Sequence, residues 1–386
     1  MENGHGTASP TPQATESSLM TAQPLGCIEP TAEDILATET LLHAPEDPLA
    51  SIPVTVSQRA GDYEIQEARY NKFIKDSATS NGLTLFDGAN IAQDILRGLG
   101  GMKPAPESFD AYLSSTQTFV NQLGVDISLG KADVTYAYGG RVPTSDELVS
   151  KSAAYLLADI VSAFSNLPKE YIELAGLKHI VIVAGTDTND VAGYAETQGR
   201  HDTIVLDILK APDQSISVHG VNHELYHLLD AASCNDRDMS VDMGYAALNG
   251  GRNMYSGKLL DNDGTYLTYT GGFQQELNID VRLIDNALSN SDDATRCQIV
   301  KDEEADQAQV AAYSNYHPNP AEDKAELGAV IPDTNDYVEF DDPKFSVLYP
   351  KFRYLLARLY HQNPGLVRFF TKTSRRPAVD PTHMNC

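Results

Sequence analysis

The stretch His223-Glu224-Leu225-Tyr226-His227 has residue types and a spacing that could carry metal chemistry. On a helix, residues four apart lie on one face, so the imidazoles of His223 and His227 can reach one ion. This H-E-x-x-H pattern is typical of zinc sites and places Glu224 beside the metal rather than on it. There its carboxylate could take a proton from a water that the metal activates. A solvated histidine pair is the alternative, but the surrounding leucines favour a buried helix and a zinc site.

A catalytic zinc ion needs a third protein ligand besides two histidines. The dipeptide Asn319-Pro320 predicts the start of a helix, on which Glu322 and Glu326 lie four residues apart on one face. Glu322 also stands where a capping box would use it, so cap and ligand are rival roles for one carboxylate. The upstream H-E-x-x-H pattern favours the ligand. His219 is a lesser candidate, because it lies one turn before the first of the two histidines.

The elements that would position these residues can be predicted around them. A capping box at Thr144 begins a helix that runs to about Phe164 and carries an apolar stripe. Two apolar runs, 179–185 and 203–209, follow as strands and lead into the histidine helix. Asp207, with Asp202 before it, is expected to blunt an exposed sheet edge. An edge strand in such a lobe can pair with an extended peptide through main-chain hydrogen bonds.

Taken together, the two motifs resemble those of the glutamate-ligand zinc peptidases (gluzincins), especially the anthrax lethal factor type. In that family a helix carrying A-E-x-x-A-E follows the H-E-x-x-H helix, as residues 321–326 do here. The resemblance implies that Glu322 joins His223 and His227 in holding one zinc ion per chain. It also implies that Glu326 holds a ligand histidine through the other nitrogen of its ring.

The resemblance extends to two further roles. Asp230, shortly after the second histidine, matches an aspartate of the family and would help to orient the site; a structural helix-end residue is the alternative. The family also has a tyrosine shortly before the ligand glutamate that stabilises the oxyanion. Tyr316 is the choice for this role and Tyr313 the reserve, although their spacing departs from the family pattern.

We therefore expect an α+β fold: a zincin-like metallopeptidase lobe of backing helix, small mixed sheet, HExxH helix and Glu-bearing helix, with a helical N-terminal region. Residues 1–45 are predicted to be a disordered tail or linker, because their composition is poor in large apolar side chains. A short acidic helix is expected within it at 31–42. Residues 46–142 are predicted to be a mostly helical accessory region, and 143–386 the catalytic domain with C-terminal helices.

The composition limits the partners. The net charge of −26 disfavours nucleic acid and anionic membranes. No apolar run reaches the roughly 18 residues of a membrane span, and no signal peptide is recognisable. We expect a cytoplasmic protein, or a secreted or cell-surface one if a leader was removed.

The four cysteines do not form a C-x-x-C pair, so a cysteine-ligated zinc site is not expected. In an oxidising compartment their number permits bridges Cys234–Cys297 and Cys27–Cys386, and four thiols are the alternative.

These features predict a zinc-dependent endopeptidase that acts on a protein or peptide substrate, with Glu224 as general base. The alternative is a catalytically inactive, zinc-stabilised binding or adhesion module. Glu224 favours the enzyme, because a structural site has no use for a carboxylate beside the ion and usually has four protein ligands. A precursor inhibited by its N-terminal region is a third possibility.

Overall fold

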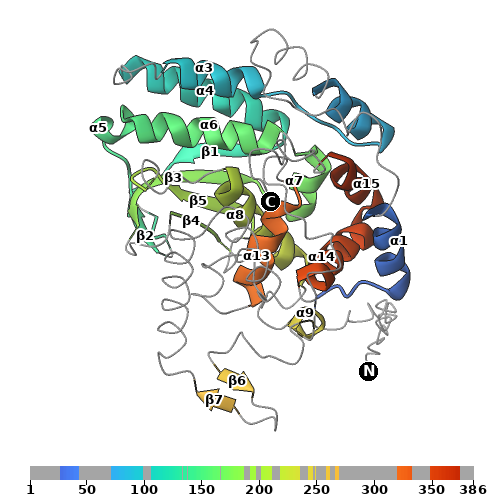
Figure 1. The fold of residues 1–386 in the computed structure, drawn as a ribbon. Coiled ribbons are helices and arrows are strands. Elements are labelled where there is room, and N and C mark those ends of the chain that lie inside the picture. Colours follow the sequence, from blue (N-terminus) through green and yellow to red (C-terminus); the bar gives the residue numbers. More distant parts are fainter. Residues whose placement is uncertain are drawn as a thin grey trace, which may run out of the picture.

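The computed structural model describes residues 27–42, 71–98, 106–132, 134–136, 138–165, 167–186, 192–196, 201–210, 218–234, 242–246, 248, 258–260, 266–268, 320–332 and 348–373. The fold is α+β, as expected, and consists mostly of helices around a small mixed sheet (Figure 1). Among the helices of these residues, none is both long and apolar enough to cross a membrane.

The main sheet has the strand order β1-β3-β5-β4. β3 (His179–Thr186) and β5 (Thr203–Asp207) are the two predicted strands and pair in parallel. β1 (Asp126–Leu129) pairs in parallel with β3, and β2 (Gly139–Arg141) continues along the same edge in the antiparallel sense. β4 (Gly193–Ala195) pairs antiparallel with β5 and ends the sheet. The sheet therefore includes strands from both sides of residue 143, where the predicted catalytic domain begins.

The prediction that Asp207 blunts an exposed edge was wrong. β5 lies between β3 and β4, and all its residues are buried. The Asp207 carboxylate accepts hydrogen bonds from the backbone N–H groups of Gly185 (3.0 Å), Thr186 (2.8 Å) and Leu209 (2.9 Å). These hydrogen bonds link the end of β3 to the residues that follow β5, so the buried carboxylate has a structural role.

The helix predicted from Thr144 to Phe164 is two helices. The capping box at Thr144 is present and begins α5 (Ser145–Leu148). The helix is then interrupted, and a second helix, α6, spans Lys151–Ser165. Ser150 is the N-cap of α6, because its hydroxyl accepts a hydrogen bond from the backbone N–H of Ala153 at 3.2 Å.

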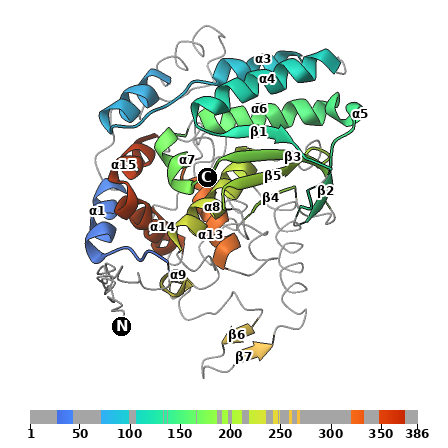
Figure 2. The same ribbon diagram turned by 180° about the vertical axis from the view of Figure 1, so that it is seen from behind.

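Helix α6 supplies much of the hydrophobic core. Its apolar stripe is fully buried and packs against α3 (Ala89–Gly98), α4 (Pro106–Gln122) and α8 (Val218–Ser233). Helix α7 (Lys169–Ala175) also packs on α8. Figures 1 and 2 show α3, α4 and α6 on one side of the strands. Helices α3 and α4 lie in the region 46–142, which was predicted to be mostly helical.

The first and last described helices lie side by side. α1 (Ala32–Leu42), close to the acidic helix predicted at 31–42, packs on α14 (Leu348–Gln362) and α15 (Pro364–Thr373) in both views (Figures 1 and 2). A disulfide between Cys27 and Cys234 joins this N-terminal segment to the end of α8. The predicted bridges Cys234–Cys297 and Cys27–Cys386 were therefore wrong, because both described cysteines are used in another pair.

The remaining described elements have no part in the main sheet. They are a helix at 71–80, α9 (Met243–Ala246), α13 (Pro320–Val330) and the antiparallel pair of β6 (Lys258–Leu260) and β7 (Tyr266–Thr268).

Candidate metal centre

Helix α8 presents its histidines on one face. Leu225 and Leu228 are fully buried and fix the helix against the core. His219, His223 and His227 follow one another at four-residue intervals, so their side chains form a row along the opposite part of the helix surface. His223 and His227 are themselves buried, whereas the side chain of His219 is 28% exposed.

Helix α13 brings two carboxylates to this row. Glu322 and Glu326 lie one turn apart on α13, which packs along α8. The helices approach closely because a glycine, Gly328, faces the ring of Tyr226; a methyl group there would come within 2.2 Å of a ring carbon. Since Glu322 meets His227 while Glu326 meets His219, the two helices run antiparallel.

Three donor atoms from the two helices converge at the centre. Nε2 of His223 lies 3.1 Å from Nε2 of His227, and Oε2 of Glu322 lies 3.3 Å from the first and 3.5 Å from the second. Ligands about 2.0–2.1 Å from a tetrahedral ion are separated from one another by about 3.3 Å. The donor types and their mutual distances therefore fit a zinc ion, and the fourth tetrahedral position would be open to water.

Glu326 lies next to this centre and touches two histidines. Its Oε1 is 2.9 Å from Nδ1 of His223, the nitrogen that faces away from Glu322. Its Oε2 is 3.1 Å from Nε2 of His219. Glu326 thus holds the predicted ligand His223 by its other ring nitrogen, in the way that carboxylates orient metal-bound histidines. The link to His219 was missed from the sequence, although its four-residue spacing from His223 was visible.

The cluster strongly favours positive charge between its carboxylates. Burial opposes the charged form of His223, but Glu322 and Glu326 outweigh this effect and raise its pKa to about 10. Burial likewise opposes ionisation of Glu322, yet hydrogen bonds from both buried histidines hold its pKa well below the usual range. Burial also opposes ionisation of Glu326, but hydrogen bonds from His219 and His223 outweigh it and lower the pKa of Glu326 to about 2. A divalent cation would meet the same demand for positive charge when the histidines are deprotonated.

The side chain of Glu224 lies beside strand β4, within electrostatic range of His223 and His227. Its carboxylate accepts a hydrogen bond from the backbone N–H of Ala195, and burial raises its pKa above the usual value. Gly193 lies next to it and is packed tightly against β5, because a β-carbon at this position would lie 2.9 Å from Leu206 and 3.2 Å from the carbonyl oxygen of Val205, whereas its 3.6 Å distance from Cγ of Glu224 would be an ordinary contact. This contact was not foreseen, because strand β4 was not predicted.

Asp230 is fully buried and pairs with cations. Its Oδ2 lies 2.6 Å from Nζ of Lys324, and its Oδ1 lies 2.7 Å from Nη1 of Arg358. The predicted role in orienting the site stays a prediction, and any such effect would pass through these partners. Tyr316 and its reserve Tyr313 lie outside the described residues, as does the predicted cap Asn319.

The chain was also compared with known proteins. No protein-family model, no curated protein and no solved structure matches it.

Proposed function

We propose that the protein is a zinc-dependent endopeptidase of the gluzincin kind, with a zincin-like lobe built from α6, the sheet, α8 and α13. His223, His227 and Glu322 are its metal ligands. The observation that carries the proposal is the mutual spacing of their three donor atoms, 3.1–3.5 Å, together with a carboxylate, Glu224, next to the first histidine. Two imidazoles and one carboxylate with an open position form a donor set of catalytic rather than structural zinc sites.

The protein's own groups have distinct tasks in this reaction. A bound zinc ion supplies Lewis acidity, which lowers the pKa of water to about 7 and polarises a peptide carbonyl. Glu224 accepts the proton of the attacking water and delivers it to the leaving amine nitrogen. Its burial raises its proton affinity, which suits a group that must take up a proton near neutral pH. Glu326 keeps the His223 ring in the orientation that presents Nε2 to the centre.

The position of strand β4 at the edge of the sheet favours a peptide as the substrate. This strand ends the sheet, and no other described strand pairs with its outer edge. An extended peptide can add to such an edge through main-chain hydrogen bonds. Because Glu224 contacts the backbone of Ala195 in this strand, a peptide on the edge would pass close to the general base.

Metal analysis and peptide digestion test the proposal. The purified chain should contain about one zinc per molecule and cleave members of a peptide library, and a chelator should abolish cleavage. Glu224→Gln should retain zinc but lose cleavage, because the amide cannot accept the proton. His223→Ala and His227→Ala should lose both. A chain that binds zinc without cleaving any peptide would instead be the inactive binding module. Equal cleavage by Glu224→Gln would exclude the mechanism.

A further inference from the structure

Helix α14 carries polar residues on a face that lies inside the protein. Lys351, Tyr354 and Arg358 follow one another at three- and four-residue spacing, so they share one side of the helix. Lys351 is fully buried and Arg358 is 2% exposed. Such long cationic side chains are rarely buried unless they are paired. Their position therefore calls for an explanation in terms of what they contact.

These cations hold both helices of the candidate metal centre. Arg358 pairs with Asp230 of α8 at 2.7 Å, and Lys351 pairs with Asp323 of α13 at 2.7 Å. The two helices are also joined directly, since Lys324 of α13 reaches Asp230 at 2.6 Å. Buried ion pairs thus join α8, α13 and α14 into one unit.

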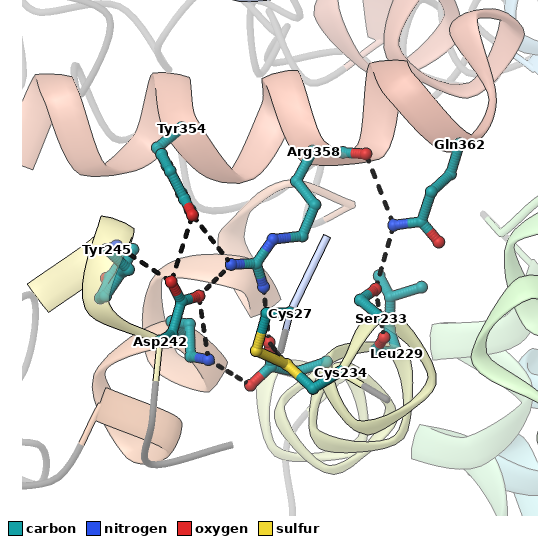
Figure 3. Close-up of polar contacts among 11 residues, drawn as sticks. Cys27, Leu229, Ser233, Cys234, Asp242, Tyr245, Tyr354, Arg358 and Gln362 are labelled. Atoms are coloured by element: carbon teal, nitrogen blue, oxygen red, sulfur yellow. Dashed lines mark hydrogen bonds and ion pairs between the residues drawn. A yellow bond between two sulfur atoms is a disulfide. The ribbon is translucent and has the colours of Figure 1, made fainter. Parts of the chain in front are cut away.

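Asp242, which precedes α9, completes the network. Arg358 pairs with its carboxylate, and the hydroxyl of Tyr354 donates to it at 3.1 Å. Lys324 lies 3.4 Å from it, and the backbone N–H of Tyr245 donates at 3.0 Å. Figure 3 shows Arg358 and Tyr354 pointing from α14 toward Asp242.

Among the described residues, the charges of this network balance. Removing so many charges from water is costly, and ion pairs of this kind contribute little to net stability compared with apolar packing. They do raise the free energy of any other helix arrangement, because a helix shifted from its register would leave buried charges unpaired. The network comprises three carboxylates and three cations: Asp230, Asp242, Asp323, Lys324, Lys351 and Arg358.

The network lies very close in sequence to the predicted ligands. Lys324 stands between Glu322 and Glu326, and Asp230 stands three residues after His227. A shift of α13 by one turn would move Glu322 away from the two histidines and at the same time separate Lys324 from Asp230. The ion pairs and the metal ligands therefore select the same register of α13 on α8.

We propose that Arg358 and Lys324 are positioning residues, which hold the glutamate helix in the one register on the histidine helix that brings the three zinc ligands together. This inference rests on the proposed function. Each of them acts through Asp230, which both of them bind.

The test measures zinc affinity in the full-length chain by competition with a chromogenic chelator, and the visible spectrum of the chain loaded with Co²⁺. Arg358→Met and Lys324→Met should weaken zinc binding by about 10–100-fold and alter the Co²⁺ spectrum. Arg358→Lys retains the charge but has one nitrogen in place of the two that reach Asp230 and Asp242, so its zinc affinity should lie between those of the unaltered chain and of Arg358→Met. The matched control is Arg353→Met, on the same helix, because Arg353 pairs with Glu39 of α1 and should not affect zinc affinity.

The outcomes separate the inference from the proposed function. If the unaltered chain binds zinc and both Met variants bind it equally well with unchanged spectra, the positioning role is wrong while the endopeptidase proposal stands. If the chain binds zinc but cleaves nothing, only the endopeptidase proposal fails. If the unaltered chain binds no zinc, both are overturned. Should the Met variants not fold, the milder Arg358→Gln and Lys324→Gln variants take their place, and zinc affinity equal to that of the unaltered chain in both would refute the inference.

Discussion

Nδ1 of His223 lies 2.9 Å from Oε1 of Glu326, while Nε2 of the same ring lies 3.3 Å from Oε2 of Glu322. The ring is therefore held on both sides by carboxylates of one helix, and its orientation is fixed before any ion binds. Such preorganisation matters because a ligand that must first rotate into place binds metal less tightly. The relationship makes Glu326 the most direct place to test how the centre is held.

Replacing Glu326 by Gln should lower zinc affinity about 10–100-fold, because the amide keeps the size of the side chain but loses the charge that holds His223. Competition with a chelator measures the change. Glu173→Gln is the matched control, since Glu173 is half exposed and pairs with Lys169 on the surface of α7. Zinc affinity equal to that of the control would mean that Glu326 does not orient the ligand.

Gly328→Ala should destabilise the protein by about 1–3 kcal/mol, because the added methyl group meets the ring of Tyr226 at the closest approach of α13 to α8. Thermal unfolding measures this loss. In a double-mutant cycle with Tyr226→Leu the two changes should be non-additive, since the smaller side chain removes the clash. Additive effects would show that the glycine is not needed for the approach of the helices.

Cys27→Ser should lower the free energy of unfolding by about 2–5 kcal/mol, because the disulfide to Cys234 closes a loop with a sequence separation of 207 residues and restricts the unfolded chain. Urea unfolding with and without a thiol reductant measures the effect. The reductant should destabilise the unaltered chain and have no effect on the variant. A reductant effect of the same size in both would assign the loss to something other than this bridge.

Much of the fold was predictable, because long apolar patterns determine helices locally. The spacing of Leu156, Ile160 and Phe164 was enough to predict a buried helix there, although the hydroxyl of Ser150 divides the expected single helix in two. Strands β1, β2 and β4 were missed. They have three or four residues each, too few to display a period of two, and their pairing partners lie elsewhere in the chain.

The part of the candidate site that could be predicted is the part whose residues lie close together in the sequence. The separation of His223 and His227 places both on one helix face whatever the rest of the chain does. That Glu322 meets them depends on packing between distant segments, and it was predicted from the need for a third ligand and from the family resemblance rather than from local spacing. The burial of Lys324 and Arg358 could not be foreseen, because a charged residue in a helix is usually solvated and its partners are far away in sequence.

Asp159, on α6, predicts how stability depends on pH. Burial raises its pKa from 3.8 to about 7, and no hydrogen bond or ion pair to another described residue compensates for it. The folded state therefore retains a proton that the unfolded state has lost between about pH 4 and pH 7. Over that window the group makes stability fall as pH rises, and the loss is complete above pH 7.

Asp159→Asn should accordingly be more stable than the unaltered chain by about 1–2 kcal/mol at pH 8, allowing for the partial exposure of the side chain. The amide resembles the neutral acid, so the difference should be much smaller at pH 4, where the carboxyl group is protonated in the folded state and only partly ionised in the unfolded state. Thermal unfolding across this pH range measures it. Asp94→Asn, at an exposed position on α3, is the control and should show little difference at either pH. A stability gain for Asp159→Asn that is the same at pH 4 and pH 8 would contradict the titration of this carboxyl group.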